Sequence, residues 1–224
     1  MPRRGNTSRI SRRRVALFIA AALVATAGSW VLVSSIGAAR RIREDAHRSR
    51  AAGLQWPHLT AAQQQILLRV EDPGFFSHHG IDFGTPGAGM TTITQGLAKI
   101  YCFERWRPGV LRKVRQSLCA LVIDASVGKE QQLAVFLNES YFGTDGEMSI
   151  RGFPAAARAH FGKAFGELER GDYVRLVAML IGPNEHHPRR NPQKLAERTR
   201  RIEKVLKGEC APSGWRDAHY EGCR

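Results

Sequence analysis

Two adjacent carboxylates, Glu71 and Asp72, follow an apolar segment and are the first side chains that could do chemistry. Apolar residues at helical spacing between Gln63 and Val70 predict a helix, and Pro73-Gly74 ends it just after the pair. Because the C-terminal end of a helix dipole is negative, it disfavours carboxylates. Either a neighbouring cation compensates a structural pair, or the helix end and partial burial raise the pKa of a working base. The residues predicted to face inward are Ile66, Leu67 and Val70.

The following residues combine glycines, neutral hydrogen-bond donors and one cation. Glycine lets a ligand approach the backbone, hydroxyls and amides donate hydrogen bonds, and Lys99 adds a positive charge. Such a surface suits a phosphate group. The spacing does not match a nucleotide-binding P-loop, in which Lys and Ser or Thr directly follow the last glycine. The glycines are Gly84, Gly87 and Gly89, and the donors are Thr91, Thr92, Thr94 and Gln95.

The order of these residues resembles the peptidoglycan glycosyltransferases, glycosyltransferase family 51. This family includes monofunctional enzymes and the first catalytic domain of class A penicillin-binding proteins. Residues 89–99, GMTTITQGLAK, resemble the family form GGSTITQQLxKN. Five blocks follow in order between Ile66 and Leu206: Glu71-Asp72 with Phe75, His78 and Gly80; Gly89–Lys99; Arg112-Lys113 through Lys129 to Asn138 and Gly143; Arg151–Gly162; and Leu180–Arg198 around Pro183 and Asn191-Pro192.

The resemblance implies transfer of a glycan from lipid II, with Glu71 as general base and β-1,4 linkage formed with inversion. Cations would neutralise the undecaprenyl pyrophosphate leaving group, and further residues would bind or shape the substrate site. No metal ligand or required cofactor is predicted, although a divalent metal, Mg²⁺ or Mn²⁺, could contribute. The predicted cations are Lys99, Arg107, Arg112 and Lys113, and the other predicted substrate-binding residues are Asp72, Phe75, Thr92, Gln95 and Gln116.

This sequence departs from the family pattern at several positions. Gln116 stands where the family places a second glutamate, so that position cannot carry a negative charge. Two rival hypotheses follow: a membrane-anchored pseudoenzyme that binds lipid II or a synthase partner, and a transferase for another polyprenyl-linked saccharide. The other departures are Met90, Gly96, Ile100 and Ala134.

The apolar spacing and the resemblance together predict a mostly α, lysozyme-like domain with few strands. A small jaw subdomain next to the membrane is expected around Ile100–Gly109, where aromatic residues alternate with arginines; a packed surface loop is the alternative. Helices are predicted at residues 110–128, 129–138, 150–161, 167–181 and 192–207. The residues predicted to form the buried side of the first of these are Val110, Leu111, Val114, Leu118, Leu121, Val122 and Ala125.

The sequence pattern at the N-terminus predicts a membrane anchor. Residues 1–14 hold six arginines and no acid, and the uncharged run Val15–Ala39 is long enough to cross a bilayer. A cleavable signal peptide has a shorter apolar core, so the uncleaved anchor with a cytoplasmic N-terminus is favoured. The predicted divisions are a basic segment at 1–14, a transmembrane helix at 15–39, a connector at 40–59, a transglycosylase domain at 60–208 and a tail at 209–224, which places the exported domain at the outer face of the inner membrane.

The charge balance narrows the class of partner. After the six N-terminal arginines are removed from 34 basic residues, 28 remain against 20 acidic ones, a formal charge of +8. An anionic lipid surface or a lipid pyrophosphate fits this charge, and the anchor and the lack of a nucleic-acid motif argue against nucleic acid. The predicted partners are lipid II, the growing glycan chain, the membrane and cell-wall synthesis or division proteins. No transpeptidase domain follows, so penicillin binding is not expected.

Four cysteines lie in the exported part, where disulfides are allowed. Cys210 and Cys223 could close a small loop in the tail. A zinc site with His219 lacks the usual ligand spacing. Cys119 is predicted to pack in the core, and Cys102 has no assignment.

Overall fold

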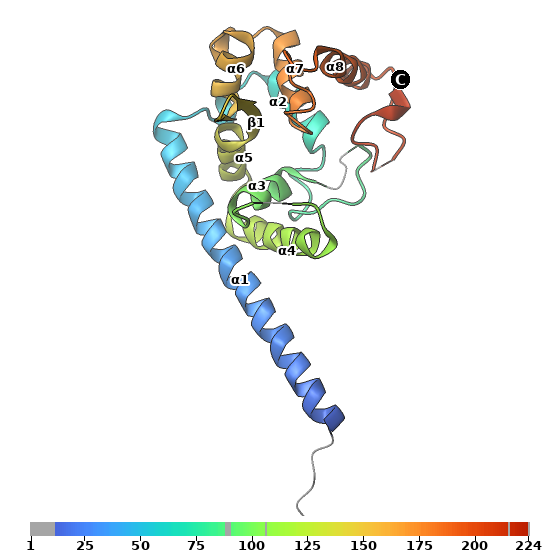
Figure 1. Ribbon diagram of the computed structural model, residues 1–224. Coiled ribbons are helices and arrows are strands. Elements are labelled where there is room, and N and C mark those ends of the chain that lie inside the picture. The colour runs from blue at the N-terminus through green and yellow to red at the C-terminus, as the bar shows by residue number, and fades with distance from the viewer. Residues whose placement is uncertain (1–11, 88–90, 106, 215, 224) are drawn as a thin grey trace, which may run out of the picture.

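The computed structural model describes residues 12–87, 91–105, 107–214 and 216–223. Within these ranges the protein is mostly helical, as predicted (Figure 1). Residues 1–11 of the predicted basic segment 1–14 and the predicted positions Gly89 and Met90 lie outside the described residues. The elements are α1 (Arg12–Ala52), η1 (Trp56–His58), α2 (Ala61–Glu71), α3 (Ile93–Tyr101), α4 (Val110–Ser126), α5 (Lys129–Glu139), β1 (Tyr141–Asp145), β2 (Met148–Arg151), α6 (Phe153–Phe161), η2 (Phe165–Glu167), α7 (Arg170–Met179), α8 (Pro192–Leu206) and η3 (Glu221–Cys223).

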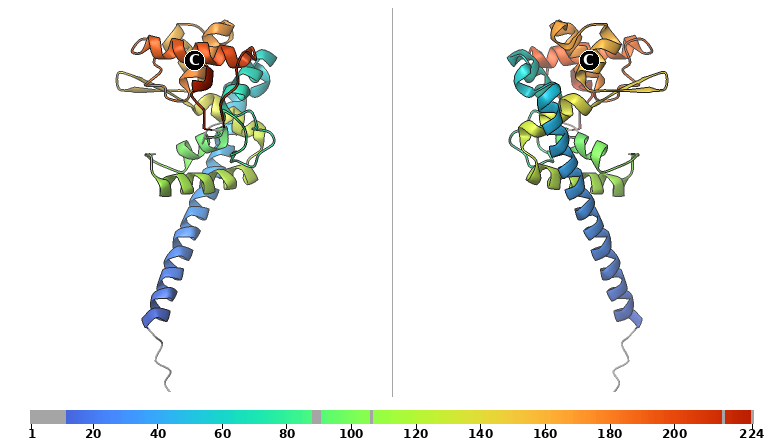
Figure 2. Two further views of the ribbon diagram at one scale, coloured as in Figure 1. Left: turned by 90° about the vertical axis from the view of Figure 1, so that its right-hand side faces the viewer. Right: turned by 90° about the vertical axis from the view of Figure 1, so that its left-hand side faces the viewer.

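Helix α1 runs unbroken through the predicted anchor and into the connector. At 1.5 Å per residue its 41 residues extend about 60 Å. Its apolar N-terminal part projects away from the domain, whereas its C-terminal part packs against α3, α4 and α5 (Figures 1 and 2). The apolar window is long enough to cross a membrane, and none of it is buried within the protein.

Helix α2 matches its prediction. Thr60 caps its start, because the Thr60 hydroxyl accepts from the Gln63 N–H and the Gln63 side chain accepts from the Thr60 N–H. The helix ends at Glu71, and Asp72 is its C-cap. Its buried residues are the three predicted ones, Ile66, Leu67 and Val70.

Helices α5 and α7 form the centre of the domain. Six consecutive residues of α5, from Gln132 to Leu137, are buried, so this helix contacts neighbours on every side. Helix α7 is similarly enclosed, and Tyr173 on it packs with Phe153 and Phe165 in an aromatic cluster. Helix α7 packs against α2 and α8, and α5 packs against α3.

A short antiparallel hairpin, β1–β2, was not predicted. Tyr141 pairs with Arg151 and Asp145 with Met148, with an irregularity between Tyr141 and Thr144. The predicted helix at 150–161 therefore begins only at Phe153. Gly152 connects the hairpin to α6 at φ 78°, and a Cβ there would lie 2.4 Å from the Asn138 carbonyl oxygen, so only glycine fits.

The prediction for the buried side of α4 is wrong. The buried residues of this helix are Gln116, Cys119, Ala120 and Ile123, which recur at three and four and face the domain. The apolar residues expected in the core lie on other sides, and Val110 is 82% exposed. The exposed apolar residues of α4 are Val110, Leu111, Val114, Leu118 and Leu121.

Two disulfides connect the four cysteines. Cys210 pairs with Cys223, the loop closure that the sequence left open as a possibility, with 5.7 Å between their Cα atoms. Cys119 pairs with Cys102, which corrects its assignment as a packing residue and gives Cys102 a role. This second bond ties the end of α3 to α4.

Candidate active site

A cavity of about 280 Å³ lies where α2, α3, α5 and the segment after α7 meet. Glu71 at the end of α2 and Lys99 on α3 both line it, so the structure brings together the predicted base and a predicted cation. The other lining residues are Thr91, Thr92, Ile93, Gly96, Ile100, Phe136, Ser140, Tyr141, Leu180, Ile181 and Pro183.

The Glu71 carboxylate is in an environment suited to proton transfer. Burial raises its pKa to about 7, and the negative charge of Asp72 adds to this effect, while Arg198 and Lys99 oppose it. Within the described residues the carboxylate has no hydrogen-bond or ion-pair partner, so its oxygens are available to a ligand. A carboxyl group with a pKa near neutrality can act as a base without being a permanent anion.

Lys99 lies near this carboxylate, and a second lysine, Lys113, lies near Lys99. Burial lowers the pKa of Lys99, and the negative charge of Glu71 partly offsets this decrease. Burial also lowers the pKa of Lys113 to about 8, and the like charge of Lys99 contributes. Two cations that repel each other in a partly buried site are arranged to receive a polyanion.

Asp72 is fully buried and joins three parts of the site. It accepts a hydrogen bond from the Ile93 N–H at the start of α3 (2.9 Å). The His78 Nε2 donates to both of its oxygens at 2.9 and 3.0 Å, because His78 Nδ1 accepts from the Gly80 N–H. Asp72 thus fixes the end of α2, which carries Glu71, against the helix that carries Lys99.

The predicted residues Thr92, Gln95 and Gln116 form a buried support around α3. The Thr92 hydroxyl caps α3 by accepting from the Gln95 N–H. The Gln95 side chain accepts from Lys113 Nζ at 3.2 Å and donates to Ser117 Oγ at 3.0 Å. Gln116 donates to the Gln95 carbonyl at 2.8 Å, and its own Oε1 is buried without a partner in the described part of the chain. Of these predicted residues, only Thr92 lines the cavity.

Phe75 is fully buried and does not line the cavity. Lys129 lies over its ring, 4.6 Å from the centroid, and donates to the His78 carbonyl. Its ammonium also pairs with Asp124 at 2.7 Å. This cluster holds the loop that follows Glu71.

The predicted arginines Arg107 and Arg112 are exposed and do not line the Glu71 cavity. Arg112 donates to the Arg105 carbonyl at 3.2 Å. By contrast, two positions that depart from the family pattern, Gly96 and Ile100, do line this cavity. A Cβ at Gly96 would lie 3.7 Å from the Phe136 ring, so the small residue widens this wall.

Sequence reasoning missed two residues next to Glu71. Arg198 on α8 is buried, donates to the Ala178 and Ala218 carbonyls, and lowers the pKa of Glu71. The Tyr173 hydroxyl is buried without a hydrogen-bond partner among the described residues. Burial raises the pKa of Tyr173, and the charge of Glu71 contributes. Their sequence signal is weak, because an arginine or tyrosine on an amphipathic helix is common.

The residues around Gln116 do not fit a divalent cation. Such a cation needs several oxygen ligands, usually including carboxylates. Gln116 instead donates to the Gln95 carbonyl, and the Gln95 side chain accepts from the cation Lys113. Within the described ranges no group of three His, Cys, Asp or Glu side chains could hold a metal.

Residues 39–207 match the family described as Transglycosylase. Similar proteins include penicillin-binding protein 1B of Buchnera aphidicola (34% identical over 64% of this chain and 20% of the relative) and of Escherichia coli (33% over 62% and 18%). Penicillin-binding protein 2a of Streptococcus pneumoniae is 30% identical over 70% of this chain and 22% of the relative.

The chain spans about a fifth of the length of these relatives. The aligned part includes the helices that carry Glu71, Lys99 and Lys113, whereas the disulfide-closed tail lies beyond the family match. Since the match covers well over half of the chain, this protein belongs to the transglycosylase family.

Proposed function

We propose that this protein polymerises lipid II into β-1,4-linked glycan strands at the membrane surface. The observation that carries the proposal is the cavity lined by both Lys99 and the Glu71 carboxylate, which has no hydrogen-bond or ion-pair partner within the described part of the chain. The family match and the relatives named as penicillin-binding proteins support the same reaction class.

Glu71 acts as the general base in this proposal. It accepts the proton of the acceptor 4-hydroxyl while that oxygen forms a bond to C1 of the donor sugar. The bond from C1 to the pyrophosphate oxygen breaks, and the leaving group takes the electron pair. Attack opposite the leaving group inverts the anomeric carbon, the geometry of inverting glycosyl transfer with a sugar hydroxyl in place of water.

The leaving group is stabilised by cations on α3 and α4. Lys99 is close enough to lower the pKa of Lys113, and a pyrophosphate between the two lysines would relieve that repulsion. Arg107 and Arg112 are both exposed. They would contact the pyrophosphate or its lipid only once substrate is bound. Asp72, Phe75, Gln95 and Gln116 act by holding these groups in place.

The membrane arrangement is part of the proposal. Helix α1 crosses the bilayer with its arginine-rich end in the cytoplasm, in keeping with the positive-inside rule. The exposed apolar side of α4 and the segment before it form the expected jaw, which contacts the outer leaflet. A reporter enzyme fused after Arg224 should be active only outside the cytoplasm, and a fusion before Met1 should give the opposite result.

Incubation of the detergent-solubilised protein with labelled lipid II tests the function, with glycan length read on a gel. Glu71→Gln should lower glycan formation by roughly two to four orders of magnitude, the usual contribution of a general base. Glu130→Gln, an exposed change on α5, is the matched control and should keep the wild-type rate. Binding of lipid II without polymer would favour the pseudoenzyme, and polymer from a different polyprenyl-linked saccharide would change the substrate.

A further inference from the structure

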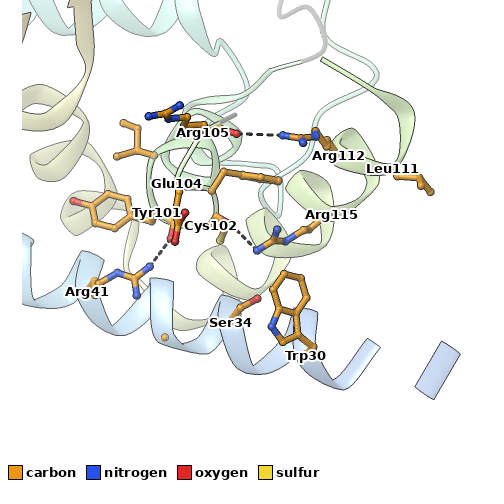
Figure 3. Close-up of a pocket in the computed structure, with 13 residues that line it drawn as sticks. Trp30, Ser34, Arg41, Tyr101, Cys102, Glu104, Arg105, Leu111, Arg112 and Arg115 are labelled. Atoms are coloured by element: carbon orange, nitrogen blue, oxygen red, sulfur yellow. Dashed lines mark hydrogen bonds between the residues drawn. The ribbon is translucent and has the colours of Figure 1, made fainter. Parts of the chain in front are cut away.

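A second and larger cavity, of about 840 Å³, lies between the membrane helix α1 and α4 (Figure 3). The segment 100–105 that leaves α3 forms its third wall. This cavity shares Ile100 with the Glu71 cavity and contains neither Glu71 nor Lys99. Its lining residues are Trp30, Ser34, Gly37, Arg41, Ile100, Tyr101, Cys102, Phe103, Glu104, Arg105, Leu111, Arg112 and Arg115.

The cavity is strongly cationic. Four arginines and one glutamate line it, for a formal charge of +3. Three of the arginines donate to backbone carbonyls instead of carboxylates: Arg41 to Tyr101, Arg112 to Arg105 and Arg115 to Cys102. Within the described ranges none of the four arginines is in a salt bridge, so their positive charge is not neutralised by the protein.

Arg115 is the best-placed cation for a ligand. Its guanidinium lies 4.2 Å from the centre of the Trp30 ring and 4.6 Å from that of Phe103. One nitrogen donates to the Cys102 carbonyl at 2.7 Å, while Nε is buried and has no hydrogen-bond partner among the residues that the structure describes. An arginine held between two aromatic rings is preorganised for a planar contact with phosphate.

The cavity lies beside the end of the apolar part of α1, where a bilayer crossed by this helix would change from hydrocarbon to headgroup. Trp30 and Ser34 belong to the last turns of the apolar part of α1, and Arg41 is among the first charged residues after it. Leu111 on the opposite wall is 85% exposed. Tryptophan beside arginine at the end of an apolar span is typical of a membrane interface.

We propose that this cavity binds the headgroup phosphate of an anionic bilayer phospholipid, with the acyl chains along the exposed apolar residues of α1 and α4. The phosphate meets Arg41 from the membrane helix and Arg115 from α4, so one lipid connects the anchor to the domain. The site contains neither Glu71 nor Lys99, and lipid binding there can be measured without polymerisation.

Trp30 provides a direct probe in membranes. The full-length protein is placed in vesicles of phosphatidylglycerol and phosphatidylcholine, with bromine on the acyl chains of one lipid or the other, so that surface charge is constant. The fluorescence of Trp30 is obtained as the difference between the wild-type signal and the signal of the variant Trp30→Phe. We expect brominated phosphatidylglycerol to quench Trp30 more strongly than brominated phosphatidylcholine does.

The arginine variants identify the groups responsible. Removing two interfacial charges in Arg41→Gln/Arg115→Gln should lower the preference for phosphatidylglycerol by roughly 30-fold. Arg43→Gln is the matched control, since Arg43 also lies on α1 and donates to a backbone carbonyl, that of Ser126, but does not line the cavity. The control should keep the wild-type preference.

Three outcomes would overturn the proposal. Equal quenching by the two brominated lipids in the wild type, a measurement that needs no variant to fold, would show that the cavity does not select an anionic lipid. Loss of the preference on addition of inorganic phosphate would assign the site to a free anion. Loss on addition of one equivalent of unbrominated lipid II would make the cavity part of the substrate site.

Discussion

The Tyr220 hydroxyl donates a hydrogen bond of 2.9 Å to the Val70 carbonyl, which joins residues 150 positions apart in the chain. Val70 lies in the last turn of α2, where carbonyls lack an intrahelical partner, and Glu71 follows it directly. The Cys210–Cys223 disulfide and the ring contact with Arg198, 5.5 Å from the guanidinium, hold Tyr220 in this place. A tail beyond the family match therefore supports the helix end that carries the proposed base.

Tyr220→Phe should destabilise the domain by about 1–3 kcal/mol, since it keeps the ring but leaves a buried carbonyl without its donor. Thermal or denaturant unfolding in detergent measures the change. His219→Ala, at the exposed neighbouring residue, is the control and should be close to wild type. Equal stability of Tyr220→Phe and wild type would show that the tail does not support α2.

Glu71 should make the stability of the protein depend on pH. Its pKa rises from 4.5 to about 7 on folding, so the folded state binds the proton more tightly than the unfolded state. The contribution of Glu71 to the free energy of unfolding should therefore be highest below pH 4.5 and fall as the pH rises through about 7, by about 3 kcal/mol in order of magnitude. Glu71→Gln removes this penalty, so the variant should gain stability relative to wild type as the pH is raised from 5 to 8.

The matched measurement is Glu130→Gln over the same pH range. Its difference from wild type should stay constant, because Glu130 is exposed on the outer side of α5. A constant difference for Glu71→Gln as well would contradict the raised pKa and weaken the case for Glu71 as base.

The proposed polymerisation should have a bell-shaped pH profile. The rate rises as Glu71 loses its proton near pH 7 and falls as Lys113 loses its charge near pH 8. Lys113→Arg keeps the positive charge at higher pH, so the alkaline limb should move upward while the acid limb stays. An unchanged alkaline limb in this variant would remove Lys113 from the leaving-group side.

The sequence was most informative where local chemistry decides the structure. The Thr60 cap, the inward face of α2 and its end at Glu71 all follow from interactions within a few residues. The hairpin had a local signal too, since Asp145-Gly146 is a strong turn dipeptide, but its strands of five and four residues are too short for a clear alternation.

The sequence predictions were wrong or incomplete where they depended on which other parts of the fold contact a helix. Helix α4 is amphipathic in the sequence, but periodicity does not say whether the apolar side meets a core or a membrane. Its buried side is instead anchored by Gln116 and by the disulfide at Cys119. Likewise, nothing near Arg198 or Tyr173 in the sequence indicates that each lies beside Glu71, because α2, α7 and α8 meet only in the folded chain.

A glutamine, Gln116, stands where the family pattern has a glutamate. This departure either weakens the enzyme or is part of how the site is built. Its amide donates to the Gln95 carbonyl at 2.8 Å inside the protein. A carboxylate cannot donate that bond and would instead face the carbonyl oxygen, so Gln116→Glu should lower stability by about 1–3 kcal/mol. We also expect no gain in polymerisation and no new dependence on Mg²⁺ or Mn²⁺, because the neighbouring groups do not form a metal site.

Measuring the melting temperature and the polymerisation rate of Gln116→Glu separates the two cases. Gln131→Glu on α5, a partly exposed glutamine that only caps its own helix, is the control for the chemical change itself. A lower melting temperature without a gain in rate means that the site is organised around a neutral amide. A higher rate with unchanged stability would mean instead that the missing carboxylate limits turnover, and the hydrogen bond to Gln95 would then be a replaceable contact.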